Sequence, residues 1–194
     1  LERAAYELAW DNIREGVFYI EVRFAPHFHT TGGLGLDAVM EAVLEGLRRG
    51  QEDFGVESGL IVCAMRNQSA ELSLRLAELA VSWFGRGCCG FDLAGEEAGH
   101  PPKHHNDAFQ LIKRRNGSLT IHAGEMDGPH QIASALTCKP SRIGHGWRII
   151  DDCTVENGRI DDAQAAEMLT RAAERAEDLV NGEIEFGGRP GRLS

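Results

Sequence analysis

Residues 60–65, Leu-Ile-Val-Cys-Ala-Met, form an unbroken apolar run between Gly59 and Arg66. A strand with one face in water alternates polar and apolar residues, whereas an unbroken apolar run is typical of a strand covered on both faces. Parallel strands that lie between helices and a core have this composition. The run therefore favours an α/β fold with a parallel sheet.

Four further short runs, bounded by glycine, proline or asparagine, also have the composition of strands. The five expected strands cover residues 18–24, 59–65, 90–93, 118–122 and 142–145. Helical periodicity is clear at 1–9, 39–47 and 69–83, and Ser69 is a candidate N-cap. This alternation predicts successive βα units, which occur both in a (β/α)8 barrel and in an open doubly wound sheet.

The sequence changes in character after Ile150. Asp161 and Asp162 precede a regular apolar pattern that predicts an amphipathic helix over 162–180, ended near Gly182. No further run with the properties of a βα strand follows. We therefore expect two parts, a partial βα barrel over residues 1–155 and a divergent helical tail over residues 156–194.

The composition excludes several classes of partner. The 194 residues include 30 acidic and 20 basic side chains, and a formal net charge of −10 repels a phosphate backbone. We therefore expect no nucleic acid partner, and no membrane partner because no apolar run approaches the ~20 residues that cross a bilayer. The five cysteines show no C-x-x-C spacing, which indicates reduced thiols in a cytoplasmic protein. Cys88 and Cys89 are expected to be buried in a strand, and the oligomeric state is left open.

Polar residues lie in or directly after the expected strands. In parallel βα folds the carboxyl ends of the strands form the reactive face, where polar side chains carry chemistry. A single histidine at such a place usually satisfies a hydrogen bond of the core, but several polar residues on one face favour a site. The polar residues in question are Glu21, Arg23, Arg66, Asp92, Glu96, His122, Glu125 and His145.

Residues 121–125, Ile-His-Ala-Gly-Glu, carry the strongest chemical signal. His122 ends an apolar strand and can present a neutral imidazole to zinc. Gly124 allows a sharp turn that brings the Glu125 carboxyl beside the same pocket, where it can donate a proton. We therefore predict hydrolytic chemistry on a small molecule, with His122 as a metal ligand and Glu125 as the acid.

His145 is flanked by Gly144 and Gly146, which allow a close approach of the backbone to a ligand. The spacing leaves two roles open, a second metal ligand or a base that orients the water.

The other histidines give weaker signals. His27 and His29 form an H-x-H pair, but Pro26 is expected to end the strand before them, which disfavours a metal site. His100, His104 and His105 are expected in a solvated loop. A zinc site of the cytidine deaminase type is excluded, because neither H-x-E nor P-C-x-x-C occurs.

Five motifs together resemble the adenosine deaminase family in order and spacing, over about residues 1 to 155. They are EVRFAP at 21–26, CAMR at 63–66, GFDLAGEE at 90–97, HAGE at 122–125 and RIGHG at 142–146. The resemblance implies an incomplete (β/α)8 TIM barrel of the amidohydrolase type. About five of the eight strands would be present, the second to the sixth, followed by the C-terminal helix.

The resemblance also implies a reaction, in which zinc activates a water that attacks C6 of adenosine to give inosine and ammonia. His122 is similar to a zinc ligand of the family, and Glu125 to the acid that protonates the ring nitrogen beside C6. His145 is similar to the residue that orients and helps to deprotonate the water, and the Gly95 N–H to a donor to another purine nitrogen. Gly144 is similar to adenosine-directed members, whereas relatives acting on adenine tend to have an acidic residue there.

Two motifs of the family have no match in this sequence. Its H-x-H zinc ligands would precede Leu1, and no S-x-D-D-P strand follows residue 150. His122 is then the one zinc ligand expected here, whereas catalytic zinc normally has at least three protein ligands. We therefore expect part of a longer adenosine deaminase that is inactive alone and does not retain the single zinc ion of the complete site. The alternatives are a related purine or adenine deaminase of the same barrel class, and a non-catalytic barrel remnant that acts as an interaction module.

Overall fold

The computed structural model describes residues 1–152, 155–156 and 159–160. Within them, five parallel strands form one sheet in the order β1-β2-β3-β4-β5. The strands are β1 (Tyr19–Phe24), β2 (Glu57–Met65), β3 (Cys88–Ala94), β4 (Ser118–Ala123) and β5 (Arg142–His145). All five expected strands are confirmed, with small differences at their ends.

Helices separate the strands. The α-helices are α1 (Glu2–Arg14), α2 (Leu36–Phe54), α3 (Ala70–Ser82), α4 (Asn106–Arg114) and α5 (Pro129–Thr137). The 3-10 helices are η1 (Pro26–His29), η2 (Pro102–His105) and η3 (Trp147–Asp152). The side chain of Ser69 accepts a hydrogen bond of 3.2 Å from the Leu72 N–H, so this residue caps α3 as predicted.

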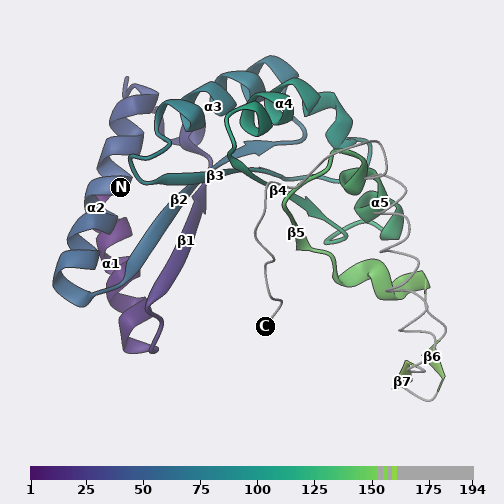
Figure 1. The fold of residues 1–194 in the computed structure, drawn as a ribbon, viewed down its shortest axis with the longest axis horizontal. Coiled ribbons are helices and arrows are strands. Elements are labelled where there is room, and N and C mark those ends of the chain that lie inside the picture. The colour runs from purple at the N-terminus through teal and green to yellow at the C-terminus, as the bar shows by residue number, and fades with distance from the viewer. Residues whose placement is uncertain (153–154, 157–158, 161–194) are drawn as a thin grey trace.

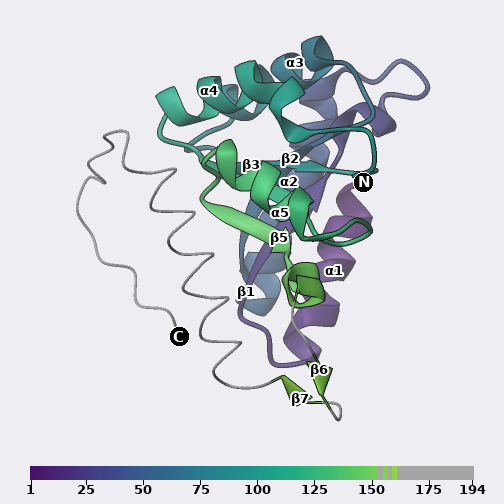
Figure 2. The same cartoon turned by 90° about the vertical axis from the view of Figure 1, so that its right-hand side faces the viewer.

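The strand order decides between the barrel and the doubly wound sheet. A doubly wound sheet reverses its strand order at a switch point, whereas here every pair of neighbouring strands is consecutive in the sequence. The sheet curves, and α3 and α4 lie on its outer side in both views (Figures 1 and 2). The described sheet is therefore an incomplete (β/α)8 barrel with five parallel strands, as the sequence predicted.

The hydrophobic core lies between the sheet and the outer helices. Alternate strand residues that point toward the helices are fully buried, as the pleat requires. The largest buried strand residues are Leu60, Phe91, Leu93, Leu119 and Ile121. They pack against buried helix residues, of which the largest are Met40, Leu76, Phe109 and Ile112. The opposite face of the same strands carries polar side chains such as Arg23, Asp92 and His122, which contact one another there. The pleat therefore separates the core from the candidate site.

Helices α1 and α2 pack closely through small residues. A Cβ atom at Gly50 would lie 2.4 Å from the Cβ of Ala9, and one at Gly46 would lie 2.2 Å from the carbonyl oxygen of Glu2. Both distances are too short for two atoms in contact. The close approach of the helices therefore depends on the absence of a side chain at Gly46 and Gly50.

The prediction of a solvated loop is wrong for His105. This residue ends η2 and is 1% exposed, with Nδ1 at 2.7 Å from the Ser73 hydroxyl and Nε2 at 3.1 Å from the Arg66 carbonyl oxygen. The tight 3-10 turn at Pro102 directs the ring inward, whereas His104 remains exposed. Burial lowers the pKa of His105, so the ring is held in its neutral form.

The expected burial of Cys88 and Cys89 is correct for Cys88 alone. Cys88 is 5% exposed, whereas Cys89 is half-buried. The cause is a register shift between β2 and β3, in which Cys88 pairs with Leu60 and Gly90 with Ile61. Cys89 lies between these two pairs and does not enter the core.

A short antiparallel pair, β6 (Val155–Glu156) and β7 (Arg159–Ile160), was not predicted from the sequence. The amphipathic helix expected over 162–180 lies outside the described residues. Among the helices that are described, none is both long and apolar enough to cross a membrane.

Candidate active site

A buried carboxylate orients His122 at the carboxyl end of β4. The Nδ1 atom of His122 lies 3.0 Å from Oδ1 of Asp92, a fully buried residue of the neighbouring strand β3. Because a carboxylate accepts hydrogen bonds, this contact assigns the ring proton to Nδ1 and leaves the Nε2 lone pair available. Histidines that bind a metal are commonly oriented in this way.

The charge of Asp92 is balanced by a cation from β1. The Nη1 atom of Arg23 lies 3.4 Å from Oδ2 of Asp92, an ion pair without the geometry of a hydrogen bond. The same nitrogen lies 3.8 Å from the Cys63 sulfur. Strands β1, β3 and β4 therefore contribute one connected polar group, in which Arg23 offsets a carboxylate that would otherwise be unpaired in the interior.

Glu125 and His145 face each other beside His122. The His145 Nε2 lies 3.3 Å from a carboxylate oxygen of Glu125, and both side chains are about 40% exposed. The rings of His122 and His145 meet edge to face, with centroids 5.0 Å apart. The three predicted residues therefore converge in one accessible place, with a carboxyl group and two imidazoles available for proton transfer.

Gly144 gives the His122 ring its space. Gly144 pairs with His122 across β4 and β5, and a Cβ atom there would lie 2.9 Å from the His122 Nδ1. The following residue, His145, has a φ of 62°, a left-handed conformation that is uncommon for a residue with a side chain. The glycine is therefore needed for the position of a neighbouring ring.

Gly95 directly follows β3, at the same edge of the sheet, with a φ of 99° that only glycine adopts readily. No described residue accepts a hydrogen bond from its N–H. The Gly95 N–H is therefore available as a donor beside the strand that carries His122.

Arg66 and Glu97 have structural roles in the site that the sequence did not predict, although both lie in the family motifs. Arg66 is 2% exposed and donates to the carbonyl oxygens of His122 and, at 3.1 Å, His100. Glu97 is 1% exposed and accepts hydrogen bonds from the backbone of residues 124–126. A charged residue directly after an apolar strand is a signal for such a role, but it does not tell which backbone groups the residue will meet.

The H-x-H pair lies apart from the strand, as predicted. Strand β1 ends at Phe24, and Pro26 begins the 3-10 helix η1 that contains His27 and His29. Burial lowers the pKa of His27.

A zinc ion fits the described residues in one respect. The donor set around His122 suits one metal ligand, because Asp92 orients the ring and Nε2 is available. Residues 1–152 with the β6–β7 strands contain no group of three or more His, Cys, Asp or Glu side chains that could hold a metal. His122 is therefore suited by its geometry to be one ligand, and the described residues alone do not form a catalytic zinc site, which needs at least three protein ligands.

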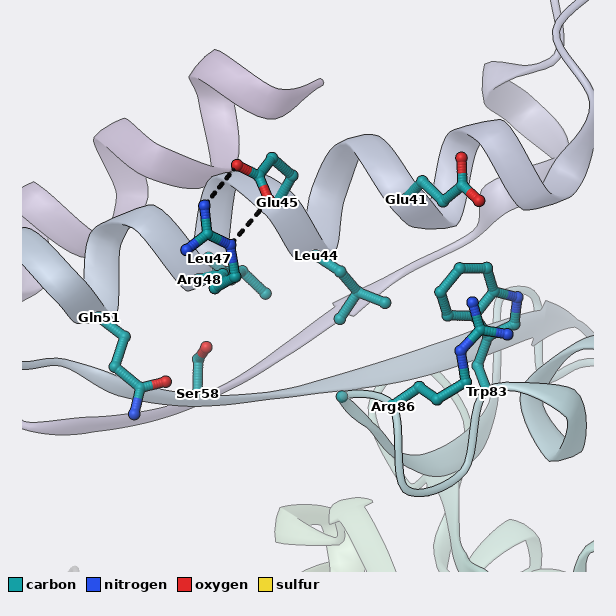
Figure 3. A pocket seen from close by; sticks show the side chains of 10 residues that line it. Glu41, Leu44, Glu45, Leu47, Arg48, Gln51, Ser58, Trp83 and Arg86 are labelled. Carbon is teal, nitrogen blue, oxygen red and sulfur yellow. Dashed lines mark hydrogen bonds and ion pairs between the residues drawn. The ribbon is translucent and has the colours of Figure 1, made fainter.

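A cavity of about 420 Å³ lies at the opposite end of the sheet (Figure 3). It is lined by Ser58 near the start of β2 and by Arg86 before β3. Arg48 is paired with Glu45, and the Arg86 guanidinium lies 3.8 Å from the centre of the Trp83 ring. Active sites of barrels lie at the carboxyl ends of the strands, whereas this cavity lies at their amino ends. None of His122, Glu125 and His145 lines it, so the cavity is distinct from the candidate site.

The sequence of this chain is similar to those of known proteins. The family model described as "Adenosine deaminase" matches residues 1–178. Adenosine deaminase 1 of Streptomyces coelicolor is 48% identical over 167 residues, which cover 82% of this chain and 42% of that protein. This chain thus spans less than half of the length of the curated relatives that it matches.

Two solved structures share the fold. Adenine deaminase from Arthrobacter aurescens is 27% identical with a TM-score of 0.70, covering 76% of this chain and 45% of that chain. An amidohydrolase with bound Zn, from Burkhoderia ambifaria, is 22% identical with a TM-score of 0.76, covering 90% of this chain and 45% of that chain. The motifs, the half-barrel, the convergence at His122 and the family match lead to one conclusion: the chain belongs to the adenosine deaminase family.

Proposed function

We propose that the protein that carries this chain is a zinc-dependent adenosine deaminase, which hydrolyses adenosine to inosine and ammonia. The observation that carries the proposal is the convergence of His122, Glu125 and His145 at the carboxyl edge of the sheet, with Glu125 3.3 Å from His145. A metal ligand, an acid and a base in one accessible place are the groups that hydrolytic removal of an amine needs.

The residues of this chain have distinct roles in the proposal. Glu125 holds a proton and delivers it to the ring nitrogen beside C6, which makes C6 more reactive toward water. His145 orients the attacking water and accepts its proton, and the Gly95 N–H donates to another purine nitrogen. His122 contributes one zinc ligand, oriented by Asp92. When bound, zinc lowers the pKa of a coordinated water so that a nucleophile is available near neutral pH.

The remaining ligands are proposed to come from sequence that is not part of this chain. Two observations support this. The described residues contain no group of three or more side chains that could hold a metal, and the chain spans under half of the length of its relatives. Sequencing the DNA that flanks the segment encoding these 194 residues tests this proposal. An in-frame H-x-H upstream is expected, and its absence would reject the proposal.

The catalytic proposal is tested with the full-length gene product. Glu125→Gln should lower turnover of adenosine by about 10²- to 10⁴-fold, because the amide cannot donate the proton, while bound zinc is unchanged. The loss of ultraviolet absorbance on conversion to inosine measures the rate. Glu78→Gln, an exposed change on α3, is the matched control and should retain full activity. Unchanged turnover in Glu125→Gln would rule out the acid role.

A purine deaminase with adenine as its substrate is the second candidate. It is favoured by the likeness to the adenine deaminase of Arthrobacter aurescens. The glycine at position 144 favours the nucleoside, since adenine-directed relatives tend to have an acidic residue there. Turnover of adenosine and adenine at equal concentration distinguishes the two.

For the chain of 194 residues alone, we propose that zinc is not retained and that catalysis is absent. A metal analysis of the purified chain should find far less than one zinc per molecule. Near-stoichiometric zinc would reject this. An interaction module without catalysis remains the alternative for the protein as a whole, and it predicts no deamination by the full-length gene product either.

We also propose a cytoplasmic location. Cys63, Cys88, Cys89 and Cys138 are free thiols in the described part of the chain, as expected in a reducing compartment. Burial raises the pKa of Cys63 to about 12 and that of Cys88 to about 11, so both thiols stay protonated and unreactive. Fusion to a fluorescent protein in the native host tests the location.

A further inference from the structure

The carboxylate of Glu97 faces three successive backbone N–H groups. Its Oε2 accepts from Gly124 at 3.0 Å, and its Oε1 accepts from Glu125 at 2.8 Å and from Met126 at 3.3 Å. Gly124 has a φ of 70°, which is the left-handed conformation. Turns that contain such a residue can point successive backbone N–H groups toward one anion. Glu97 therefore occupies a preformed anion site that is made by the loop after β4.

This contact explains how a charged side chain can be 1% exposed. Within residues 1–152, no basic side chain forms an ion pair with Glu97, so its charge is offset by hydrogen bonds from the backbone. Hydrogen bonds to an ionised acceptor are about twice as strong as neutral ones. The loop and the carboxylate therefore stabilise each other's position.

Glu97 also ties the loop to two other elements. It lies three residues after the end of β3, and its carbonyl oxygen accepts a hydrogen bond of 3.2 Å from the Gln131 side chain on α5. The same Gln131 nitrogen donates to Asp127 at 2.8 Å. The segment 124–131 is thus fixed at both ends.

We propose that Glu97 is the positioning residue for Glu125, because it fixes the backbone from which the Glu125 side chain projects toward His145. In this role Glu97 acts through the backbone of residues 124–126 and not by contact with the substrate. Its carboxylate holds the Glu125 N–H itself, so a shift of this contact moves the proton donor directly. The inference rests on the proposed function, in which Glu125 delivers a proton.

The first test uses the chain of 194 residues and does not depend on activity. Glu97→Gln keeps the size of the side chain but turns one acceptor into an NH₂ group that faces backbone donors. Hydrogen exchange at the amides of residues 124–126 should become about tenfold faster or more, while exchange in β3 and β4 stays the same. Glu96→Gln is the matched control, since Glu96 is adjacent and exposed, and it should leave all rates unchanged. Unchanged exchange at 124–126 in Glu97→Gln would overturn the inference.

The second test uses the full-length gene product. Glu97→Gln should lower kcat for adenosine by about 10²-fold with a much smaller change in KM, as expected when a proton donor is displaced by about 1 Å. Glu97→Asp keeps the charge and should restore part of the loss. A variant destabilised elsewhere to the same Tm, such as Gly50→Ala, should keep its kcat. If that variant loses as much kcat as Glu97→Gln, Glu97 is only structural and the inference is wrong.

The two tests separate the inference from the proposed function. If the unmodified full-length gene product does not deaminate purines, the proposed function fails. The role of Glu97 in positioning a proton donor then fails with it, even where the exchange result supports the contact between Glu97 and the loop. If the gene product is active and Glu97→Gln retains kcat, the proposed function stands and the positioning role is rejected.

Discussion

Burial in the fold controls the protonation of His105, which is 1% exposed. Burial lowers the pKa of His105, and the hydrogen bond with the Arg66 carbonyl offsets this only in part. Protonation is therefore less favourable in the folded chain than in the unfolded chain. The stability that comes from neutral His105 is fully present above the ordinary histidine pKa of about 6.5 and is lost as the pH falls below it.

We expect a weaker pH dependence of stability in His105→Gln than in the unmodified chain. The free energy of unfolding, measured by urea denaturation between about pH 7.5 and 5.5, should fall less steeply in the variant because one histidine no longer resists protonation. Part of the dependence should remain, since burial also lowers the pKa of His27.

His104→Gln is the comparison for this measurement and should change the slope less than His105→Gln, because His104 is exposed and its charge is a smaller cause of the lowered His105 pKa than burial is. Equal slopes for His105→Gln and the unmodified chain would contradict the assignment of His105 as a buried neutral ring.

At the scale of elements, the contact between α1 and α2 depends on glycines of α2. Gly50→Ala should lower the free energy of unfolding by about 1–3 kcal/mol, since the new Cβ would lie 2.4 Å from the Cβ of Ala9 and the helices would have to separate. Chemical denaturation measures the change. Gln51→Ala, at the next and exposed position, should change the stability by no more than about 0.5 kcal/mol. A stable Gly50→Ala variant would mean that the helices can move apart at little cost.

Elements with strong local patterns could be predicted from the sequence, and those that depend on distant contacts could not. The apolar runs located all five parallel strands, and Ser69 located the start of α3. The pair of β6 and β7 has two residues in each strand, which is too short for any periodicity to appear. The strand order also needed the structure, because the spacing of βα units fits two architectures.

The same distinction holds at the candidate site. Polar residues at the end of a strand or just after it, such as His122 and Glu125, can be found in a sequence because the apolar strand itself does not need them. The Asp92 contact with His122 joins residues 30 apart, and the Glu97 contact with Gly124 joins residues 27 apart. The burial of Glu97 beside exposed Glu96 depends on where the loop after β4 turns, and no local pattern reports that.

At the scale of the whole molecule, one ion pair joins the two outermost strands of the main sheet. The Nη1 atom of Arg142 on β5 lies 2.7 Å from a carboxylate oxygen of Glu21 on β1, and Tyr19 donates to the other oxygen at 3.0 Å. The sheet order places three strands between these two. The pair therefore spans the concave side of the half-barrel.

We expect the Glu21 and Arg142 side chains to be coupled in a double-mutant cycle. Because both are partly exposed, the coupling energy from Glu21→Gln and Arg142→Gln should be about 0.2–1 kcal/mol and should decrease at high salt. Urea denaturation of the four proteins measures it. The exposed pair of Arg3 and Glu7 within α1 is the comparison. A coupling that does not respond to salt would show that the contact is not mainly electrostatic.

The same pair has a consequence for the time course of folding. Its two residues are 121 positions apart, and closing so long a loop early would cost chain entropy that a single exposed ion pair does not return. Contacts of this kind form late, after nearer strands have paired. The Glu21–Arg142 contact should therefore appear only when β2, β3 and β4 are in place, so a probe at this pair would report the last step of sheet assembly.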